Sequence, residues 1–205
     1  MVKTINIYLL RHGKTLAEPS LCGSTDVLVS EQHQNEIAQA IMAKRLDIQQ
    51  IVTSPLRRCR DLALKLKYGS SAELTEHNQL KEMHFGDFDG VPFEQLKSQW
   101  PLLDKFWQQP AQVTLPNAEP LPEFYQRVSL AWQQLIEESE QDTLVVCHGG
   151  TIRMILSDIL QVDWQSPTWY SRLHIGHHSL THIKITKAEQ NYIQVCSISA
   201  PLSFE

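Results

Sequence analysis

The segment Ile5-Asn6-Ile7-Tyr8-Leu9-Leu10 runs directly into Arg11-His12-Gly13. Its nearly unbroken aliphatic and β-branched residues predict a buried strand. The segment Thr143-Leu-Val-Val-Cys147 predicts a second buried strand, and it runs into His148-Gly149-Gly150 in the same way. In an open α/β sheet, ligands bind beyond the carboxyl ends of the strands. We therefore expect His12 and His148 to lie in one crevice.

The rest of the chain supplies the other elements of such a sheet. Ser30 predicts the N-cap of a helix that runs through Arg45. Further predicted elements are a strand over residues 50–53, a helix that begins at Pro55, helices over 121–138 and 151–160, and alternating terminal strands over 179–187 and 192–199. The βαβα order predicts a three-layer α/β/α fold whose mostly parallel sheet has an antiparallel edge. We expect residues 1–205 to form one domain, with a small cap over about residues 69–122.

Composition limits the partners that the chain can have. Its 205 residues include 18 Lys and Arg against 23 Asp and Glu, a formal net charge of -5. This acidic balance argues against a nucleic-acid partner and against a polybasic membrane patch. No apolar stretch approaches the roughly 20 residues that span a bilayer, and the first ten residues lack the features of a signal peptide. The four cysteines have no CxxC spacing, so we expect reduced thiols and a cytoplasmic protein.

A third strand end opens onto a helix at Thr53-Ser54-Pro55-Leu56-Arg57-Arg58. The N-terminus of a helix attracts anions, and a nearby guanidinium offers paired donors. Arg58 lies in the first turn and is the arginine that we expect to point inward, whereas Arg57 and Arg60 suit a solvated helix face. Together with Arg11, Arg58 predicts fixed positive charge at this edge of the sheet.

Four motifs follow one another in chain order and carry a family resemblance. They are Arg11-His12-Gly13 with Thr15, Ser54-Pro55-Leu56-x-Arg58, Glu82-x-x-Phe85-Gly86-x-Phe88-x-Gly90, and His148-Gly149. In this order they resemble the histidine phosphatase superfamily, whose members are phosphoglycerate mutase-like. Within this superfamily, the chain as a whole is similar to the α-ribazole phosphatases. The resemblance implies phosphatase activity without a metal or any other cofactor.

The resemblance also assigns roles to five residues. His12 would be the nucleophile that forms a phosphohistidine, and Glu82 would protonate the leaving alkoxide and then deprotonate the attacking water. Arg11, Arg58 and a protonated His148 would bind the phosphate oxygens. A neutral imidazole is a competent nucleophile at physiological pH, and preorganised cationic donors stabilise the charge on the transferring phosphoryl group.

Four further residues are candidates for substrate contacts: Lys14, Thr15, Gly23 and Gly149. Thr15 either caps the turn after His12 or touches phosphate. Lys14 stands where the family commonly has Glu or Gln, which leaves it free to contact an anionic group. The loop over residues 16–22 looks shortened and lacks the usual Asn, so family contacts from this loop are not carried over.

Other side chains compete for some of these roles. Asp87 and Asp89 lie close to Glu82 in the sequence, and only the family resemblance favours Glu82 as the acid. Asp26 is expected to be structural. The dense histidines His174, His177, His178 and His182 invite a metal site, but Gly176 and the strand-like alternation after it argue against one. We expect these histidines to line the rim of the site or to pack at the start of a strand.

The four motifs and the family that they resemble predict a metal-independent phosphomonoesterase that acts on a small phosphorylated metabolite. A candidate substrate is α-ribazole 5'-phosphate of cobalamin biosynthesis. A phosphoglycerate mutase-like phosphotransferase and a broad-specificity phosphatase are the alternatives, and the short middle region favours hydrolysis. A non-catalytic phosphate-binding module has no need of a nucleophile and a proton donor. The aromatic residues between Phe85 and Trp107 either stack on a base or form the core of the cap. A homodimer is left open.

Overall fold

The computed structural model describes residues 2–203, whose strands form one mixed sheet. The strand order is β3-β2-β4-β1-β5-β6. The pairs β1–β4, β4–β2 and β2–β3 are parallel, and β1–β5 and β5–β6 are antiparallel. The strands are β1 (Lys3–Arg11), β2 (Gln50–Thr53), β3 (Glu73–Glu76), β4 (Thr143–Cys147), β5 (Ser179–Lys187) and β6 (Tyr192–Pro201). The predicted mostly parallel sheet with an antiparallel edge is confirmed.

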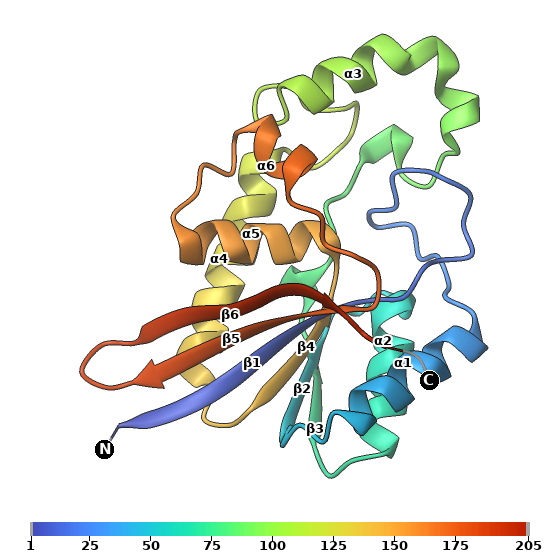
Figure 1. Cartoon of the computed structure of the whole chain (residues 1–205). Helices are drawn as coiled ribbons and strands as arrows, with labels where there is room; N and C mark the ends of the chain where they lie inside the picture. Colours follow the sequence, from blue (N-terminus) through green and yellow to red (C-terminus); the bar gives the residue numbers. More distant parts are fainter. Residues whose placement is uncertain (1, 204–205) are drawn as a thin grey trace.

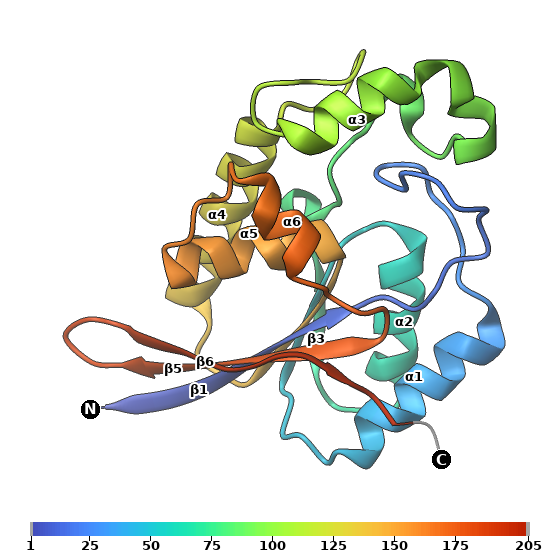
Figure 2. The same cartoon turned by 45° about the horizontal axis from the view of Figure 1, so that its top comes forward.

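Helices cover both faces of the sheet, which gives the three predicted layers (Figures 1 and 2). α1 (Glu31–Ala43) and α2 (Arg57–Tyr68) pack on one face, where Leu10 and Val146 belong to their apolar core. α4 (Leu121–Glu138) and α5 (Gly149–Leu160) pack on the other face against Leu9, Val145 and other residues. Side chains alternate between the faces of a strand, so the continuous apolar runs of β1 and β4 supply both cores.

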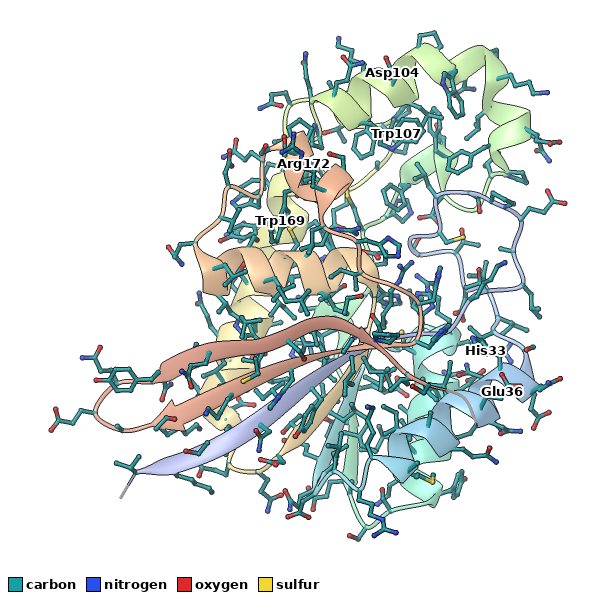
Figure 3. The ribbon with its side chains drawn as sticks, viewed as in Figure 1. His33, Glu36, Asp104, Trp107, Trp169 and Arg172 are labelled. Atoms are coloured by element: carbon teal, nitrogen blue, oxygen red, sulfur yellow. The ribbon has the colours of Figure 1, made fainter. Side chains whose placement is uncertain are left out.

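The N-terminal end of α1 packs closely against the turn that follows β1. The Ser30 side chain accepts a hydrogen bond from the backbone N–H of His33, as expected of an N-cap. A Cβ atom on Gly13 would lie 2.7 Å from the Ile37 side chain and 2.8 Å from His33. Glycine at position 13 therefore lets α1 approach the site. Figure 3 shows His33 and Glu36 on α1, where His33 Nδ1 lies 3.1 Å from a Glu36 carboxylate oxygen.

The chain between β3 and α4 leaves the sheet and lies above its carboxyl end, beside the loop that follows β1 (Figure 1). It contains the short 3-10 helices η1 (Asn78–Leu80), η2 (Gly86–Phe88) and η3 (Phe93–Gln99), and α3 (Trp100–Gln108). Backbone hydrogen bonds join it to the loop after β1, from Gly90 N–H to Leu21 O over 2.7 Å and from Phe93 N–H to Pro19 O over 3.0 Å. Residues 19–21 are thereby fixed against this segment.

Most of the strands and α-helices match their sequence-based bounds, and three of them within residues 2–203 were not predicted. β2, α4, β4 and β5 have the expected ends, whereas α2 begins at Arg57 rather than Pro55 and α5 begins two residues early, at Gly149. The elements missed by the sequence analysis are β3, α3 and the one-and-a-half-turn α6 (Pro167–Arg172). Within residues 2–203, no helix is both long and apolar enough to cross a bilayer.

Candidate active site

His12 and His148 lie together beyond the carboxyl ends of two neighbouring strands. β1 and β4 are parallel with Arg11 opposite Cys147, and the backbone N–H of His12 donates to the Cys147 carbonyl over 3.2 Å. The centroids of the two imidazole rings are 5.2 Å apart. The sheet thus brings the two histidines, 136 positions apart in the sequence, into one crevice.

The two ring nitrogens of His12 have different surroundings. Nδ1 lies 2.8 Å from the carbonyl oxygen of Gly13. Because a carbonyl only accepts, we assign the proton to Nδ1, which leaves the lone pair of Nε2 free. Burial, followed by the charges of Arg58 and Arg11, holds the pKa of His12 well below its ordinary value. The ring is therefore neutral at physiological pH, as a nucleophilic imidazole must be.

Arg11 is held beside His12 by the segment that leads into β5. Its Nη1 donates to the carbonyl of Ile175, and its Nη2 lies 3.0 Å from Nε2 of His177. Since a guanidinium only donates, His177 Nε2 accepts this bond and carries no proton. Burial, and then the charge of Arg11, lowers the pKa of His177 to about 4. The ring centroids of His177 and His12 are 5.7 Å apart, so His177 is part of the site.

Arg58 and His148 form a fully buried pair beneath His12. Arg58 Nε donates to His148 Nδ1 over 3.2 Å, and His148 Nε2 lies 2.8 Å from the Ser54 hydroxyl. Burial and the charge of Arg58 hold the pKa of His148 well below its ordinary value. The sequence analysis expected a protonated His148 as a ligand of phosphate, and that role stays a prediction. The imidazole is neutral here because its Nδ1 lone pair accepts from a permanent cation.

The carboxylate of Glu82 is fixed by backbone N–H groups. Oε2 accepts from the N–H of Gly150, in the first turn of α5, over 3.0 Å, and Oε1 accepts from the N–H of Met83 over 3.1 Å. A Cβ atom on Gly150 would lie 2.3 Å from Oε1. A residue with a side chain at position 150 would therefore displace the carboxylate. The N-terminal end of α5 is a favourable place for a negative charge.

A pocket of about 380 Å³ lies between His12 and the Glu82 carboxylate. Its lining includes Arg11, His12, Lys14, Thr15, Glu82 and His177. Arg58 and His148 are fully buried and are not part of this lining. Gly149 lies under the Arg11 guanidinium, because a Cβ atom there would be 3.2 Å from Arg11 Cζ. Five predicted site residues thus line the pocket, and Gly149, Arg58 and His148 lie beneath it.

Gly23, a predicted substrate contact, has a different environment. Its carbonyl accepts from Arg58 Nη2 over 2.5 Å, and its N–H donates to Asp89 over 3.2 Å. A Cβ atom on Gly23 would lie 2.0 Å from the carbonyl oxygen of Met83, so only glycine fits. Gly23 therefore helps to hold Arg58 in place. Asp89, a competitor of Glu82 in the sequence, is the carboxylate that anchors this loop.

Asp26 and His182 have structural contacts. Asp26 Oδ1 accepts from the backbone N–H of Arg57 over 2.7 Å and so caps the start of α2, as expected. His182 stacks on Tyr8 with centroids 4.7 Å apart and bonds to Asn6 Oδ1 over 2.9 Å. Across residues 2–203, no three His, Cys, Asp or Glu side chains are grouped so that they could hold a metal ion.

Comparison with protein families gives the chain its relatives. Residues 7–197 match the family model of the histidine phosphatase superfamily, branch 1. The chain belongs to this superfamily. The family resemblance inferred from the four motifs is thereby confirmed.

Three similar proteins, one found by sequence and two by structure, show the degree of similarity. The bifunctional protein Rv2228c of Mycobacterium tuberculosis is 31% identical over 180 residues, which cover 85% of this chain and 49% of that protein. The chain therefore spans about half the length of the first curated relatives that it matches. The mycobacterial glucosyl-3-phosphoglycerate phosphatase Rv2419c superposes with a TM-score of 0.80 at 22% identity, covering 97% of this chain and 100% of that one. The α-ribazole phosphatase from Shigella flexneri gives 0.76 at 18% identity, with 96% and 98% covered.

Sequence reasoning placed His177 with three other histidines, at the rim of the site or at the start of a strand, and singled none of them out. The density of histidines from His174 to His182 drew attention to the segment, yet no motif distinguished one ring from another. The antiparallel pairing of β5 with β1 decides the matter, because it places the start of β5 beside Arg11 and His12. A histidine just before a strand that neighbours the strand leading to His12 is the signal that could have found it.

Proposed function

We propose that this chain is a metal-independent phosphomonoesterase that works through a phosphohistidine on His12. The observation that carries the proposal is a neutral, buried imidazole whose Nε2 lone pair is free, in a pocket that also holds Arg11 and Glu82. The four ordered motifs and membership of the superfamily support it. A binding module would have no use for a nucleophile and a carboxyl group facing the same pocket.

In the first step, Nε2 of His12 attacks phosphorus while the P–O bond to the leaving alcohol breaks. The electron pair of that bond goes to the alcohol oxygen, which takes the proton of Glu82. In the second step, the Glu82 carboxylate accepts a proton from water as the water oxygen attacks phosphorus and the P–N bond breaks, releasing phosphate. Arg11 offers fixed donors to the phosphoryl oxygens in both steps.

Arg58 and His148 remain in the proposal as phosphate-binding residues. To reach phosphate, they must exchange bonds to the carbonyls of Gly23 and Thr25 and to the Ser54 hydroxyl for phosphate oxygens. A dianion close to His148 favours its protonated form, because an opposite charge stabilises the imidazolium. The protonated His148 expected from the sequence therefore belongs to the complex in this mechanism.

The proposed substrate is a small phosphorylated metabolite, with α-ribazole 5'-phosphate as a candidate and broad-specificity hydrolysis or a mutase-like transfer as the alternatives. The α-ribazole phosphatase of Shigella flexneri shares the fold, so α-ribazole 5'-phosphate stays among the candidate substrates. We further propose a single domain whose cap covers about residues 69–122, since the core on the α4 and α5 face includes Leu103 and Phe106 of α3. A cytoplasmic location is part of the proposal, because all four cysteines are free. The homodimer stays a prediction.

The test is turnover of p-nitrophenyl phosphate in EDTA, together with trapping of the phosphoenzyme after rapid quenching. We expect His12→Ala to lower kcat by about 1000-fold or more and to abolish the trapped phosphohistidine, because no other group can accept the phosphoryl unit. Exposed His174, converted to alanine, is the matched control and should retain activity. A His12→Ala variant with wild-type turnover would refute the mechanism, and isomerised phosphoglycerate without free phosphate would favour the mutase.

A further inference from the structure

A second pocket lies on the other side of Glu82 from the phosphate pocket. It has a volume of about 210 Å³, and Glu82 belongs to the lining of both pockets. The proposed function places the leaving oxygen next to this carboxyl group, because Glu82 must reach that oxygen to protonate it. The rest of the leaving alcohol then has a direct route into the second pocket. The following inference rests on the proposed function.

The walls of this second pocket are mostly apolar. They include Leu21, Phe85, Phe106, Trp107, Phe124 and Met154, from the loop after β1, the cap segment, α4 and α5. Trp107 lies on the side of α3 that faces the rest of the molecule (Figure 3). Phe85 and Phe106 meet edge to face with centroids 6.4 Å apart. Walls of this kind suit a ring-sized apolar group.

Arg153 brings a cation to this apolar pocket. It lies one turn after Gly150 on α5, and its Nε and Nη2 both donate to the Leu173 carbonyl, over 3.1 and 2.9 Å. Within residues 2–203, Nη1 has no hydrogen-bond partner, and no carboxylate lies within ion-pair distance of Arg153. Burial lowers the pKa of Arg153, and the charge of Glu82 acts in the opposite direction.

The proton-donor role of Glu82 leaves the charge of Arg153 with less negative charge near it. When Glu82 is protonated, as the first step requires, its negative charge near Arg153 is gone. A half-buried guanidinium without an anion is costly, so a ligand that supplies one is favoured. Arg127 shows the contrast, because Glu119 pairs with it at 2.5 Å. On the phosphate side of Glu82, Arg11 likewise lacks a carboxylate within ion-pair distance among the described residues, and the substrate phosphate would supply its anion.

We propose that the second pocket binds a leaving alcohol with a ring-sized apolar body and a carboxylate, which Arg153 Nη1 recognises. The substrate is then an anion at both ends, with its phosphate at Arg11 and His12 and its carboxylate at Arg153. Glu82 lies between the two ends, where the ester oxygen must be. Arg153 is a specificity-determining residue in this arrangement, and a neutral alcohol such as α-ribazole ranks below a carboxylate-bearing one.

The experiment compares 3-carboxyphenyl phosphate with its neutral isostere, 3-carbamoylphenyl phosphate. The wild-type enzyme should prefer the carboxylate in kcat/KM by about tenfold or more, which is the value of one charge-assisted hydrogen bond. Arg153→Met should abolish this preference, mainly through KM. Arg172→Met removes an exposed arginine of the nearby α6, visible in Figure 3, and should leave the preference intact.

The outcomes separate this inference from the proposed function. Failure of the wild type to hydrolyse either ester would count against the phosphatase. Hydrolysis of both at equal kcat/KM, or an equal loss of preference in Arg153→Met and Arg172→Met, would overturn the inference alone. Should Arg153→Met not fold, inhibition of the wild type by products replaces it. There, 3-hydroxybenzoate must inhibit more strongly than 3-hydroxybenzamide, and equal inhibition would again overturn the inference.

Discussion

Glu82 shows how one glycine can set the position of a carboxylate beside a pocket. The carboxylate rests against the backbone of Gly150, whose N–H it accepts, and no space remains between them for a methyl group. Glycine is a poor helix former, yet here it lies in the first turn of α5, where the N–H groups have no partner within the helix. The second glycine of the His-Gly-Gly motif is therefore explained by the Glu82 carboxylate that packs against it.

Gly150→Ala tests this seat. The new Cβ atom would meet Glu82 Oε1 at 2.3 Å, so the carboxylate must move, and we expect kcat for p-nitrophenyl phosphate to fall by about 100-fold, as for a misplacement of about 1 Å. The Tm should change little, because alanine suits a helix better than glycine.

Gly176→Ala is the control for this prediction, because its nearest neighbour, Ser199 Oγ, would be 3.6 Å away in ordinary van der Waals contact. That variant should keep nearly full activity. Unchanged kcat in Gly150→Ala would show that Glu82 does not need this position.

At the scale of elements, the long helices and most strands could be predicted, whereas the edge strand β3 and the short helices α3 and α6 could not. The strands β1, β2 and β4 are apolar runs with clear ends, and β5 alternates polar with apolar residues, so pattern alone finds them. β3 is a four-residue edge strand with a glutamate at each end, and its exposed residues give no apolar signal. α3 has nine residues and begins with Trp100-Pro101, and α6 has six residues. Both helices are therefore too short to show a clear helical periodicity.

The same division applies to the candidate site. Short sequence motifs include His12, Glu82, Arg11 and Gly149, so the local pattern can identify these residues. His177 depends on which strand neighbours β1, and the pairing of Arg58 with His148 depends on the loop that folds over it. Long-range packing of this kind has no trace in the local pattern, which is why the sequence did not show that Arg58 donates to His148 Nδ1.

Asp89 joins the loop after β1 to the segment between β3 and α4, and this contact gives an element-scale prediction. Its carboxylate accepts from the N–H groups of Gly23, Ser24, Thr25 and Phe85 at 2.9 to 3.2 Å. Burial alone raises the pKa of Asp89, but hydrogen bonds from these groups outweigh burial and leave it lowered. The loop in turn holds the guanidinium of Arg58 through its carbonyls.

We expect Asp89→Ala to destabilise the fold by about 3 kcal/mol, because four backbone N–H groups, three of them in part-buried hydrogen bonds, lose a charged acceptor. kcat/KM should fall as well, since Arg58 loses its support. Urea unfolding and steady-state kinetics measure the two effects.

Asp87→Ala is the matched control for Asp89. Asp87 is exposed and accepts from Asn117 over 2.9 Å, so its loss should have little effect on either measurement. Equal destabilisation by the two variants would contradict a special role for Asp89.

At the scale of the whole molecule, charge is distributed unevenly. The chain has a net charge of -5, yet Arg11, Arg58 and Arg153 lie around one site. This local field suits a small anion, whereas a long polyanion would also cross the acidic remainder of the surface. The exclusion of nucleic acid from composition is thus compatible with an anionic substrate.

The same cations make the fold sensitive to acid. His12, His148 and His177 all have a lowered pKa, caused first by burial and then, for His12 and His148, by Arg58, and for His177 by Arg11. In the unfolded chain these histidines take up protons near their ordinary pKa of about 6.5, while in the folded chain they stay neutral. The unfolded state therefore binds more protons below that pH, and stability falls as pH falls.

The resulting prediction concerns Tm between pH 7.5 and pH 5.5, a window above the ordinary range of carboxyl groups. We expect Tm to be lower at pH 5.5 by about 5 °C or more. The double variant His12→Asn, His148→Asn lacks two of the responsible groups, so its Tm should depend less on pH, whereas His174→Asn, at an exposed position, should follow the wild type. If the double variant keeps the full pH dependence, the acid sensitivity arises elsewhere in the molecule.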